Sequence, residues 1–207
     1  MEEFYTIDRD AEAELIEKRS KFISHLFYVE TIEEAEARIK EIKKEYHDAK
    51  HNCYAYAIET RDGGIAIKYN DDGEPSGTAG SPMLKVLLEK QITNVLVITT
   101  RYFGGVLLGT GGLVRAYTDS VIKALEKVNV IKKKIGYNVE IELNYNEFEI
   151  AKRFFENLGG KLINAEFLEN VKINVEIDKN SLEYVKTGHD KIGFEIKKID
   201  ILEEKFI

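Results

Sequence analysis

Apolar and polar residues in the first half of the chain repeat with two different periods. Apolar side chains recur every three or four residues over 31–46 and 113–128, which predicts two amphipathic helices. Thr31 followed by Glu34 has the pattern of a capping box, so we expect the first helix to begin there. Segment 81–91 predicts a third, shorter helix with a proline in its first turn.

Runs of apolar and β-branched residues predict three strands in the same half. Segments 53–60 and 64–69 are expected to be strands separated by a short turn, and segment 94–103 is apolar enough to be buried on both faces. The turn contains Asp62, Gly63 and Gly64. Segment 101–117 therefore begins in a strand, passes through a glycine-rich loop and ends in a helix.

The second half has a more regular pattern, from which we predict six elements. They are a strand at 139–145, a helix at 150–158, a hairpin of strands at 161–168 and 171–177, a helix at 182–188 and a strand at 192–196. We expect Asn146 and Asn180 to cap the two helices and Gly188 to end the second one. The order βαββαβ is that of the ferredoxin-like plan, a small antiparallel sheet with two helices on one face.

These two patterns divide the chain at a basic run that lies between Asn129 and Tyr137. We predict an α+β protein with one domain over residues 1–132 and a small ferredoxin-like domain over residues 133–207.

Composition indicates a globular protein without a membrane span or a disulfide framework. Hydrophobic residues make up 43% of the 207 residues and charged residues 32%, and no apolar run approaches the roughly 18 residues of a transmembrane helix. The first residues are acidic where a signal peptide would be basic and then apolar. Cys53 is the single cysteine, so we expect a reducing compartment, with the cytoplasm as the default.

The net charge of −7 limits how the chain can meet nucleic acid. Fifteen acidic and ten basic side chains lie in residues 135–207, so most of the acidic excess is there. Such a chain does not coat DNA by charge alone and needs a local basic patch. Lys132, Lys133 and Lys134 are one candidate, although three lysines on an exposed strand more commonly form a solvated edge.

The sequence RYFGGVLLGTGGLVRAY, residues 101–117, contains five of the fifteen glycines. The first backbone N–H groups of a helix have no partner within it and attract anions, so the helix start is a candidate phosphate site. The alternative is a tight strand-to-helix turn in which glycines supply positive φ and close packing. The candidate residues are Gly109, Thr110, Gly111 and Gly112, with Arg115 about one turn further on.

A second candidate feature lies at the end of the apolar strand, where an arginine and two aromatic residues precede two glycines. Such a set can stack on bases or bind phosphate. The alternative is that Phe103 packs in the core and Arg101 pairs with a nearby carboxylate. The candidate binding residues are Arg101, Tyr102, Gly104 and Gly105.

Carboxylates gather in the segment DDGEPSGTAGSP, residues 71–82. Asp71, Asp72 and Glu74 have the oxygen ligands that Mg²⁺ prefers, and the same residue types also form plain turns. The chain's two prolines bracket Thr78 and its small neighbours, which favours a rigid loop that serves as a working surface.

Three further residues are candidates for metal or covalent chemistry. His47 and His51 are four apart, but a helix end followed by a strand would separate their side chains. Cys53 lies in an apolar alternation, which favours a buried thiol over a nucleophile. We therefore predict neither a metal site nor a cofactor.

The segments DDGEPSGTAGSP (71–82), VLVITTRYFGGVLLGTGGLVRAY (95–117) and HNCYAYAI (51–58) resemble the signature of the IMPACT family, in its bacterial YigZ-type branch. The resemblance covers nearly the whole chain. It implies a first domain with a βαβ fold like that of ribosomal-protein and elongation-factor modules. It also implies a second domain similar to the last domain of elongation factor G.

The same resemblance implies a role in translation. Eukaryotic members of the family act in translational control under amino-acid starvation by binding a protein partner, and they carry an additional N-terminal domain that this sequence does not include.

Two functional hypotheses follow. The first is a non-catalytic cytoplasmic factor that binds RNA, the ribosome or a translation-associated protein through the loops 71–80 and 101–112. The second is a Mg²⁺-dependent enzyme that acts on a phosphorylated or nucleotide substrate, with Asp71, Asp72 or Glu74 holding the metal or acting as a base.

Overall fold

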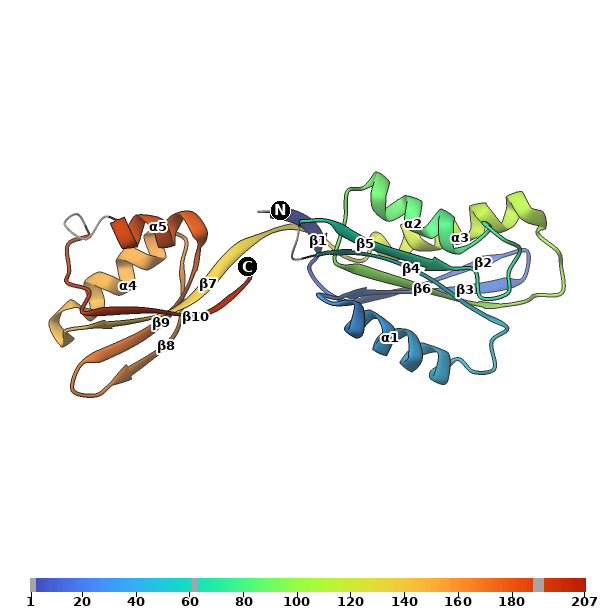
Figure 1. Cartoon of the computed structure of the whole chain (residues 1–207). Helices are drawn as coiled ribbons and strands as arrows, with labels where there is room; N and C mark the ends of the chain where they lie inside the picture. Colours follow the sequence, from blue (N-terminus) through green and yellow to red (C-terminus); the bar gives the residue numbers. More distant parts are fainter. Residues whose placement is uncertain (1–2, 61–62, 188–191) are drawn as a thin grey trace. The chain divides into compact units, whose positions relative to one another are not determined.

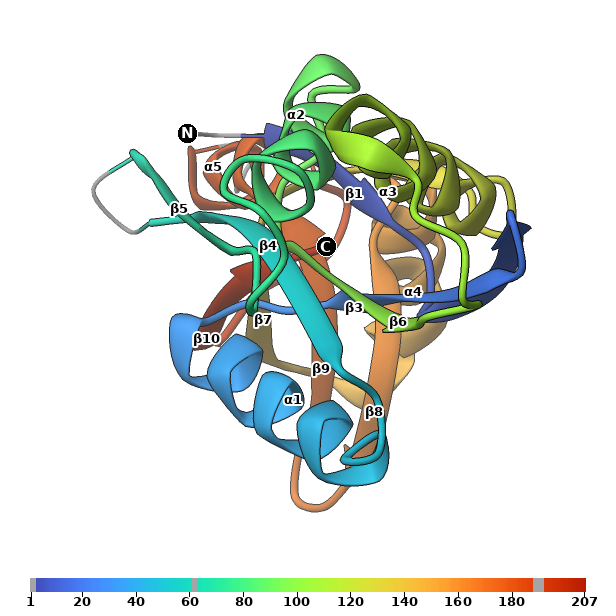
Figure 2. The ribbon, with the colours of Figure 1, turned by 90° about the vertical axis from the view of Figure 1, so that its right-hand side faces the viewer.

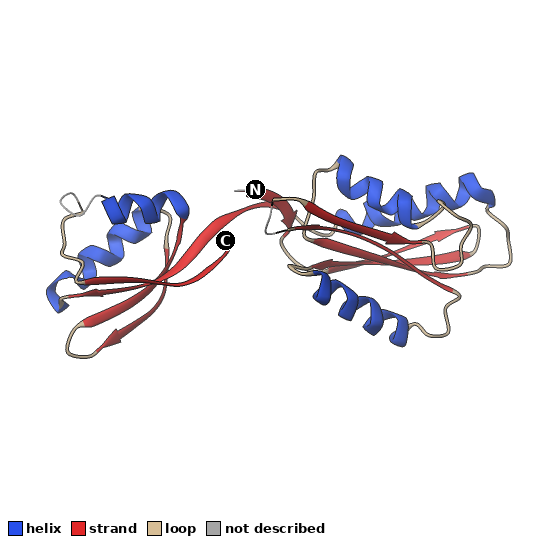
Figure 3. Cartoon of the chain, viewed as in Figure 1, coloured by secondary structure: helices blue, strands red, loops and turns tan. Residues whose placement is uncertain are grey.

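A computed structural model of the chain describes residues 3–60, 63–187 and 192–207. Over these residues it is a mixed α+β structure with two sheets and five α-helices (Figure 1; Figure 3). It divides into two compact units, Glu3–Lys132 and Lys133–Ile207. No helix in the described part of the chain is long and apolar enough to cross a membrane.

The first unit is built on an antiparallel sheet between two layers of helices. The order of its strands is β2 (Ala11–Glu17), β3 (Ser20–Tyr28), β6 (Val95–Tyr102), β4 (His51–Glu59) and β5 (Ile65–Asn70). Figures 1 and 2 show α1 (Ile32–Glu45) on one face of this sheet, and α2 (Gly80–Glu89) and α3 (Gly109–Leu125) on the other.

The central strands β4 and β6 are buried on both faces, as the sequence predicts for β6. Because successive side chains of a strand point to opposite faces, Cys53, Ala55 and Ala57 join the core under α2 and α3. Tyr54 and Tyr56 join the core under α1. A two-sided core of this kind fixes the register of both strands, since a slip of one residue would exchange the two faces.

The predicted helices of the first unit are confirmed. Thr31 caps α1 by accepting a hydrogen bond from the backbone N–H of Glu34 at 3.1 Å. The strands β1 (Glu3–Ile7), β2 and β3 were not predicted from the sequence. In β2 most side chains are exposed and acidic or small, so its apolar alternation is weak. The predicted turn residue Asp62 lies outside the described residues.

The second unit has the predicted order of elements. It contains β7 (Val130–Leu143), α4 (Phe148–Asn157), β8 (Lys161–Phe167), β9 (Val171–Asp178), α5 (Lys179–Thr187) and β10 (Lys198–Phe206). Antiparallel pairs join β8 to β9, β9 to β7 and β7 to β10. Apolar residues of α4 and α5 share one core with β7 and β9, so both helices cover one face of the sheet.

Two details of the second unit differ from the prediction, and a third is not tested. Asn144 with Glu147, rather than Asn146, forms the capping box, and it opens a short 3-10 turn before α4. Asp178, rather than Asn180, caps α5 by accepting from the N–H of Ser181 at 2.7 Å. The predicted helix end Gly188 lies outside the described residues.

The last strand was predicted too early in the sequence. Ile192 and Phe194 are buried in a bend, and strand pairing begins only at Lys198. Their alternation reflects burial in the core of this unit, which a loop can provide as well as a strand.

Candidate functional site

The loop after β5 is held in shape by Asp71, which organises the start of α2. Its Oδ1 accepts from the backbone N–H groups of Ala79 at 3.0 Å and Gly80 at 2.8 Å, and its Oδ2 accepts from Gly77 at 2.8 Å. Helix α2 has no cap from its own N-cap residue. The Asp71 carboxylate therefore satisfies amides that would otherwise lack partners at the helix start.

The neighbouring Asp72 is also engaged within the protein. Its Oδ2 accepts from the backbone N–H of Asn52 at 2.7 Å, and its Oδ1 pairs with Lys43 Nζ at 2.5 Å. Thr78 turns back into the loop and donates to the carbonyl of Pro75 at 2.6 Å. These contacts produce a rigid loop, and they occupy both aspartates with donors from the chain itself.

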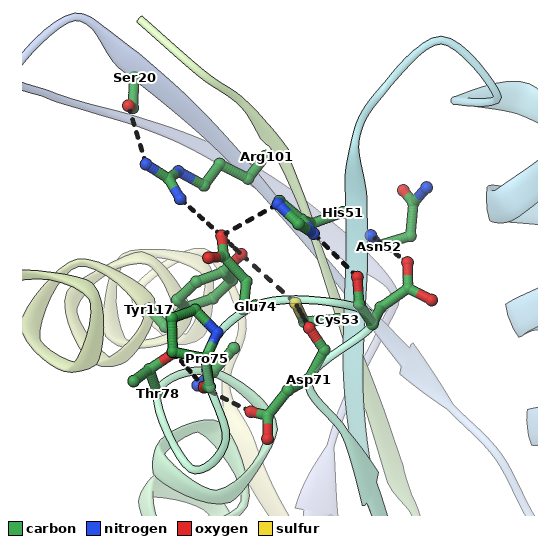
Figure 4. Close-up of polar contacts among 12 residues, drawn as sticks. Ser20, His51, Asn52, Cys53, Asp71, Glu74, Pro75, Thr78, Arg101 and Tyr117 are labelled. Atoms are coloured by element: carbon green, nitrogen blue, oxygen red, sulfur yellow. Dashed lines mark hydrogen bonds and ion pairs between the residues drawn. The ribbon is translucent and has the colours of Figure 1, made fainter. Parts of the chain in front are cut away.

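Glu74 is the carboxylate of this loop that points into the molecule (Figure 4). Its Oε1 accepts from Arg101 Nη1 at 2.6 Å and from the hydroxyl of Tyr117 at 3.0 Å. Glu74 and Arg101 side chains are only 3% and 7% exposed. A charge-assisted pair at this depth is protected from solvent, and loss of either partner would leave a buried charge uncompensated.

Strand register brings the arginine to this position. Arg101 on β6 lies directly across from His51 on β4 and from Phe22 on β3. Side chains paired in this way share one face of the sheet, here the face that α3 covers. The guanidinium carbon lies 5.4 Å from the ring centroid of Phe22 and 5.7 Å from that of Phe103.

His51 completes the buried polar group with a defined tautomer. Its Nδ1 lies 2.8 Å from the carbonyl oxygen of Asp72, which can only accept, so Nδ1 carries a proton. Its Nε2 lies 3.9 Å from Glu74 Oε1, at ion-pair rather than hydrogen-bond distance.

Cys53 and Tyr117 lie behind the carboxylate and remain protonated. The Cys53 thiol donates to the carbonyl of Asp71 at 3.0 Å and contacts the Tyr117 hydroxyl at 3.3 Å. Burial raises the pKa of the Cys53 thiol to about 12 and raises the pKa of Tyr117 as well. A thiol in this state is a poor nucleophile, because the thiolate is the reactive form.

The glycine-rich segment after β6 forms an exposed loop with a tight base. Gly104 passes so close to the start of β3 that an added Cβ would lie 2.0 Å from the backbone carbon of Arg19 and 2.4 Å from the backbone nitrogen of Ser20. On either side of it in the sequence, Phe103 is 51% exposed and Leu107 83% exposed, so this loop presents apolar side chains to solvent.

Helix α3 begins at the end of this loop without a side-chain cap. Leu108 at the N-cap position makes no capping hydrogen bond, and Gly109 has a φ of +73°. Thr110 and Gly111 in the first turn are exposed. The first amides of the helix therefore face solvent, where they and the helix dipole favour an anion.

A cavity of about 390 Å³ joins these features. Glu74, Arg101 and His51 line it together with the start of α3, and Lys50 is a further lining residue. Its apolar lining residues are Pro75, Phe103, Leu107, Leu108 and Leu113. A volume of this size is within the usual range for small-molecule sites.

A family model described as the Impact N-terminal domain matches residues 18–125, a range that contains the whole lining of the cavity. The IMPACT family member YvyE of Bacillus subtilis is 44% identical over 176 residues, which cover 85% of this chain and 80% of that protein. The chain belongs to the IMPACT family.

Two further comparisons extend this assignment. The IMPACT family member YigZ of Escherichia coli is 33% identical over 160 residues, 77% of this chain and 78% of that protein, which supports the bacterial YigZ-type branch. A solved structure described as the crystal structure of an hypothetical protein matches with a TM-score of 0.65 and 28% identity, over 98% of this chain and 97% of that one.

The IMPACT signature segments meet at the cavity, but their charged residues serve different purposes. Arg101 is buried in its pair with Glu74 instead of projecting from the surface as the binding hypothesis supposes. Tyr102 is half-buried and donates to Asp48 at 2.7 Å, a hydrogen bond that raises its pKa to about 12. Arg115 is exposed on α3, one turn after Gly111.

The carboxylates of the signature do not converge on a metal position. Among the described residues no group of three or more His, Cys, Asp and Glu side chains could hold a metal ion. His47 contacts the carbonyl of Lys44 after the end of α1, while His51 lies in β4, so the helix end separates them as expected.

Several residues of the cavity were not recognised from the sequence of this IMPACT protein. No motif or periodicity in the sequence singled out Lys50, Leu107 or Leu108 as cavity residues. His51 and Tyr117 did carry one: alternation along β4 places His51 on the same face as Cys53, and helical spacing places Tyr117 on the buried face of α3. That His51 and Tyr117 lie close together depends on which strands are neighbours in the sheet, which local periodicity does not indicate.

Proposed function

We propose that this chain is a non-catalytic cytoplasmic factor that binds RNA, alone or in the ribosome, through the loop 101–112 and the first turn of α3. The observation that carries this proposal is the uncapped, exposed start of α3 beside an exposed aromatic ring and a lysine on the rim of one cavity.

The chemistry of this surface suits single-stranded RNA. Helix amides at Thr110 and Gly111 can receive a phosphate, and Lys50 and Arg115 add positive charge that the described structure leaves exposed. Phe103 offers a ring on which an unstacked base can lie. The resemblance to a family whose eukaryotic members act in translational control supports a partner in translation.

The enzyme hypothesis is not favoured by a specific observation. It needs Asp71, Asp72 or Glu74 to hold a metal or to act as a base. Each of these carboxylates accepts hydrogen bonds from the chain itself: Asp71 from the loop, Asp72 from β4, and Glu74 from Arg101 and Tyr117. We therefore propose RNA binding and no enzymatic activity.

The test is binding of a fluorescent single-stranded RNA, measured by anisotropy over a series of KCl concentrations. Lys50→Ala and Arg115→Ala should each weaken binding and lower the slope of log K against log salt by about 1, since each removes one phosphate contact. Lys44→Ala and Lys123→Ala are matched controls, because both lysines are exposed, lie in the last turns of α1 and α3, and neither lines the cavity nor lies near the start of α3 in the sequence.

Co-sedimentation with ribosomes provides the second measurement. Reduced co-sedimentation of the Lys50 and Arg115 variants, with unchanged controls, would support the proposal. If the wild-type chain bound neither RNA nor ribosomes but was retained by a translation-associated protein, RNA binding would be wrong and the surface would be a protein interface.

A further inference from the structure

The cavity beside α3 contains an unpaired buried donor in addition to the helix start. Arg101 is 6% exposed and uses Nη1 for Glu74, and its Nη2 makes a long contact of 3.4 Å to Ser20 Oγ. Within the described residues its Nε has no hydrogen-bond partner. A buried N–H without an acceptor is unfavourable, so an oxygen atom supplied by a ligand would be stabilised there.

This donor is covered by its neighbours, and one of them is loosely packed. The Nε atom is itself buried, so a ligand reaches it only if a neighbouring group turns aside. Phe103 lies against the guanidinium and is half-exposed, so its rotation would cost little packing. The opposite neighbour, Phe22, is fully buried and packs edge-on against Tyr117.

The charges on the lining favour an anionic ligand. Arg101 and Glu74 compensate one another, so among the described residues that line the cavity the positive features without an anionic partner are the Lys50 ammonium group and the uncapped amides of α3. An anion at the mouth would meet both, and the helix start is preorganised for the oxygen geometry of a phosphate.

The apolar lining favours a flat, uncharged body attached to that anion. Phe103, Leu107 and Leu113 line the same cavity as the polar floor formed by His51 and Glu74. A nucleobase presents two apolar faces and a polar edge, and aromatic side chains commonly stack on such faces.

We propose that this cavity binds a nucleoside monophosphate, with its phosphate at the start of α3 and Lys50 and its base against Phe103 and Leu107. The ligand is either a free nucleotide or one unstacked nucleotide of an RNA, and only the second case rests on the function proposed above. In both cases Phe103 turns to admit the base.

The experiment compares two aspartate substitutions in one loop. Leu107→Asp introduces a negative charge on the lining of the cavity, and Val106→Asp introduces the same charge at the preceding residue, which does not line it. Both positions are exposed, so both variants should fold, which circular dichroism checks. Isothermal titration calorimetry of the full chain then uses AMP, GMP, CMP and UMP, with adenosine and inorganic phosphate as partial ligands.

We expect saturable binding of at least one monophosphate, and weaker binding of adenosine and of phosphate alone. Leu107→Asp should lower the affinity for the monophosphate by roughly tenfold or more, which corresponds to about 1.4 kcal/mol. Val106→Asp should lower it by less than about twofold. Absence of monophosphate binding, or equal effects of the two substitutions, would overturn the proposal.

Competition separates the two sources of the ligand. If a monophosphate displaces a bound RNA oligonucleotide, the cavity takes a nucleotide of the RNA. Monophosphate binding without RNA binding would support the cavity and contradict the proposed function. RNA binding that neither monophosphate nor Leu107→Asp affects would leave the proposed function standing and refute the nucleotide cavity.

Discussion

At the scale of single residues, the two arginines of the glycine-rich segment differ, because Arg101 is paired with Glu74 inside the protein. Both side chains are almost fully buried, and Tyr117 and His51 adjoin the carboxylate. Arg115, by contrast, is exposed. The two arginines, which look equivalent in the sequence, should therefore give different phenotypes.

Arg101→Ala should destabilise the fold by about 3–5 kcal/mol, because it leaves the Glu74 carboxylate buried without its cation. Arg115→Ala should change the free energy of unfolding by less than about 0.5 kcal/mol, as is usual for an exposed side chain. Urea unfolding followed by circular dichroism measures both. An Arg101→Ala variant as stable as the wild type would show that the pair is not a structural element.

A second prediction at this scale concerns pH. His25 is buried on β3 with Nδ1 3.2 Å from Glu12 Oε2, and its ring lies near those of Tyr46 and Phe27. Burial lowers its pKa below the ordinary 6.5, and Glu12 and Glu45 act in the opposite direction. Between the folded pKa and 6.5 the unfolded chain binds more protons, so stability rises with pH there and falls as the pH is lowered.

His25→Gln should flatten the pH dependence of the unfolding free energy just below pH 6.5, because it removes the group whose protonation differs between the two states. Equal slopes for wild type and His25→Gln would mean that His25 titrates alike in the folded and unfolded chains.

At the scale of elements, the glycines of the loop and of α3 have different tasks. Gly104 is required by the close approach of the Arg19 backbone, whereas Gly111 has open space around its Cβ position and an ordinary φ. A glycine that the packing requires, Gly104, thus lies only a few residues from one that the packing does not require, Gly111.

Gly104→Ala should destabilise the first unit by more than about 1 kcal/mol, since backbone rather than a flexible side chain must move. Gly111→Ala should be neutral or stabilising by up to about 1 kcal/mol, because alanine is the better helix former. Thermal unfolding of the two variants checks this. A stable Gly104→Ala protein would show that the contact with β3 relaxes easily.

The elements also show how far the sequence predicts the structure. Helical periodicity predicted α1 correctly, because only one side of this helix is buried. Apolar runs predicted β4 and β6 correctly, because these strands are buried on both faces. The cap of α4 was misplaced by two residues, since Asn144 and Asn146 are equally good caps by type. The strand predicted at Ile192 was a buried bend, because alternation reports burial and not strand pairing.

The site was predictable in part. Both signature loops were predicted to form one surface, and they line one cavity; that this is a working surface stays a prediction. Which carboxylate pairs with Arg101 could not be predicted, because Asp71, Asp72 and Glu74 are neighbours of the same chemical type. Only the neighbour relation of β4 and β6 places His51 beside Arg101, and pairing between distant segments is not encoded in local periodicity.

At the scale of the whole molecule, charge restricts where RNA can bind. The chain is acidic overall, with a net charge of −7. In the second unit, the half-buried Lys172 and the exposed Lys198 pair with neighbouring carboxylates, so its strands carry mixed charge. Under the proposed function, a polyanion would be attracted by a small region of the first unit, at Lys50, Arg115 and the start of α3.

The most direct test is a titration of the uniformly ¹⁵N-labelled full chain with a short single-stranded RNA, followed by amide chemical shifts. We predict the largest amide shift changes at Thr110, Gly111 and Gly112, and smaller ones at Lys50 and Phe103. No amide of residues 133–207 should follow the same binding curve. Shifts confined to residues 133–207, or saturation without movement of the first amides of α3, would contradict the account.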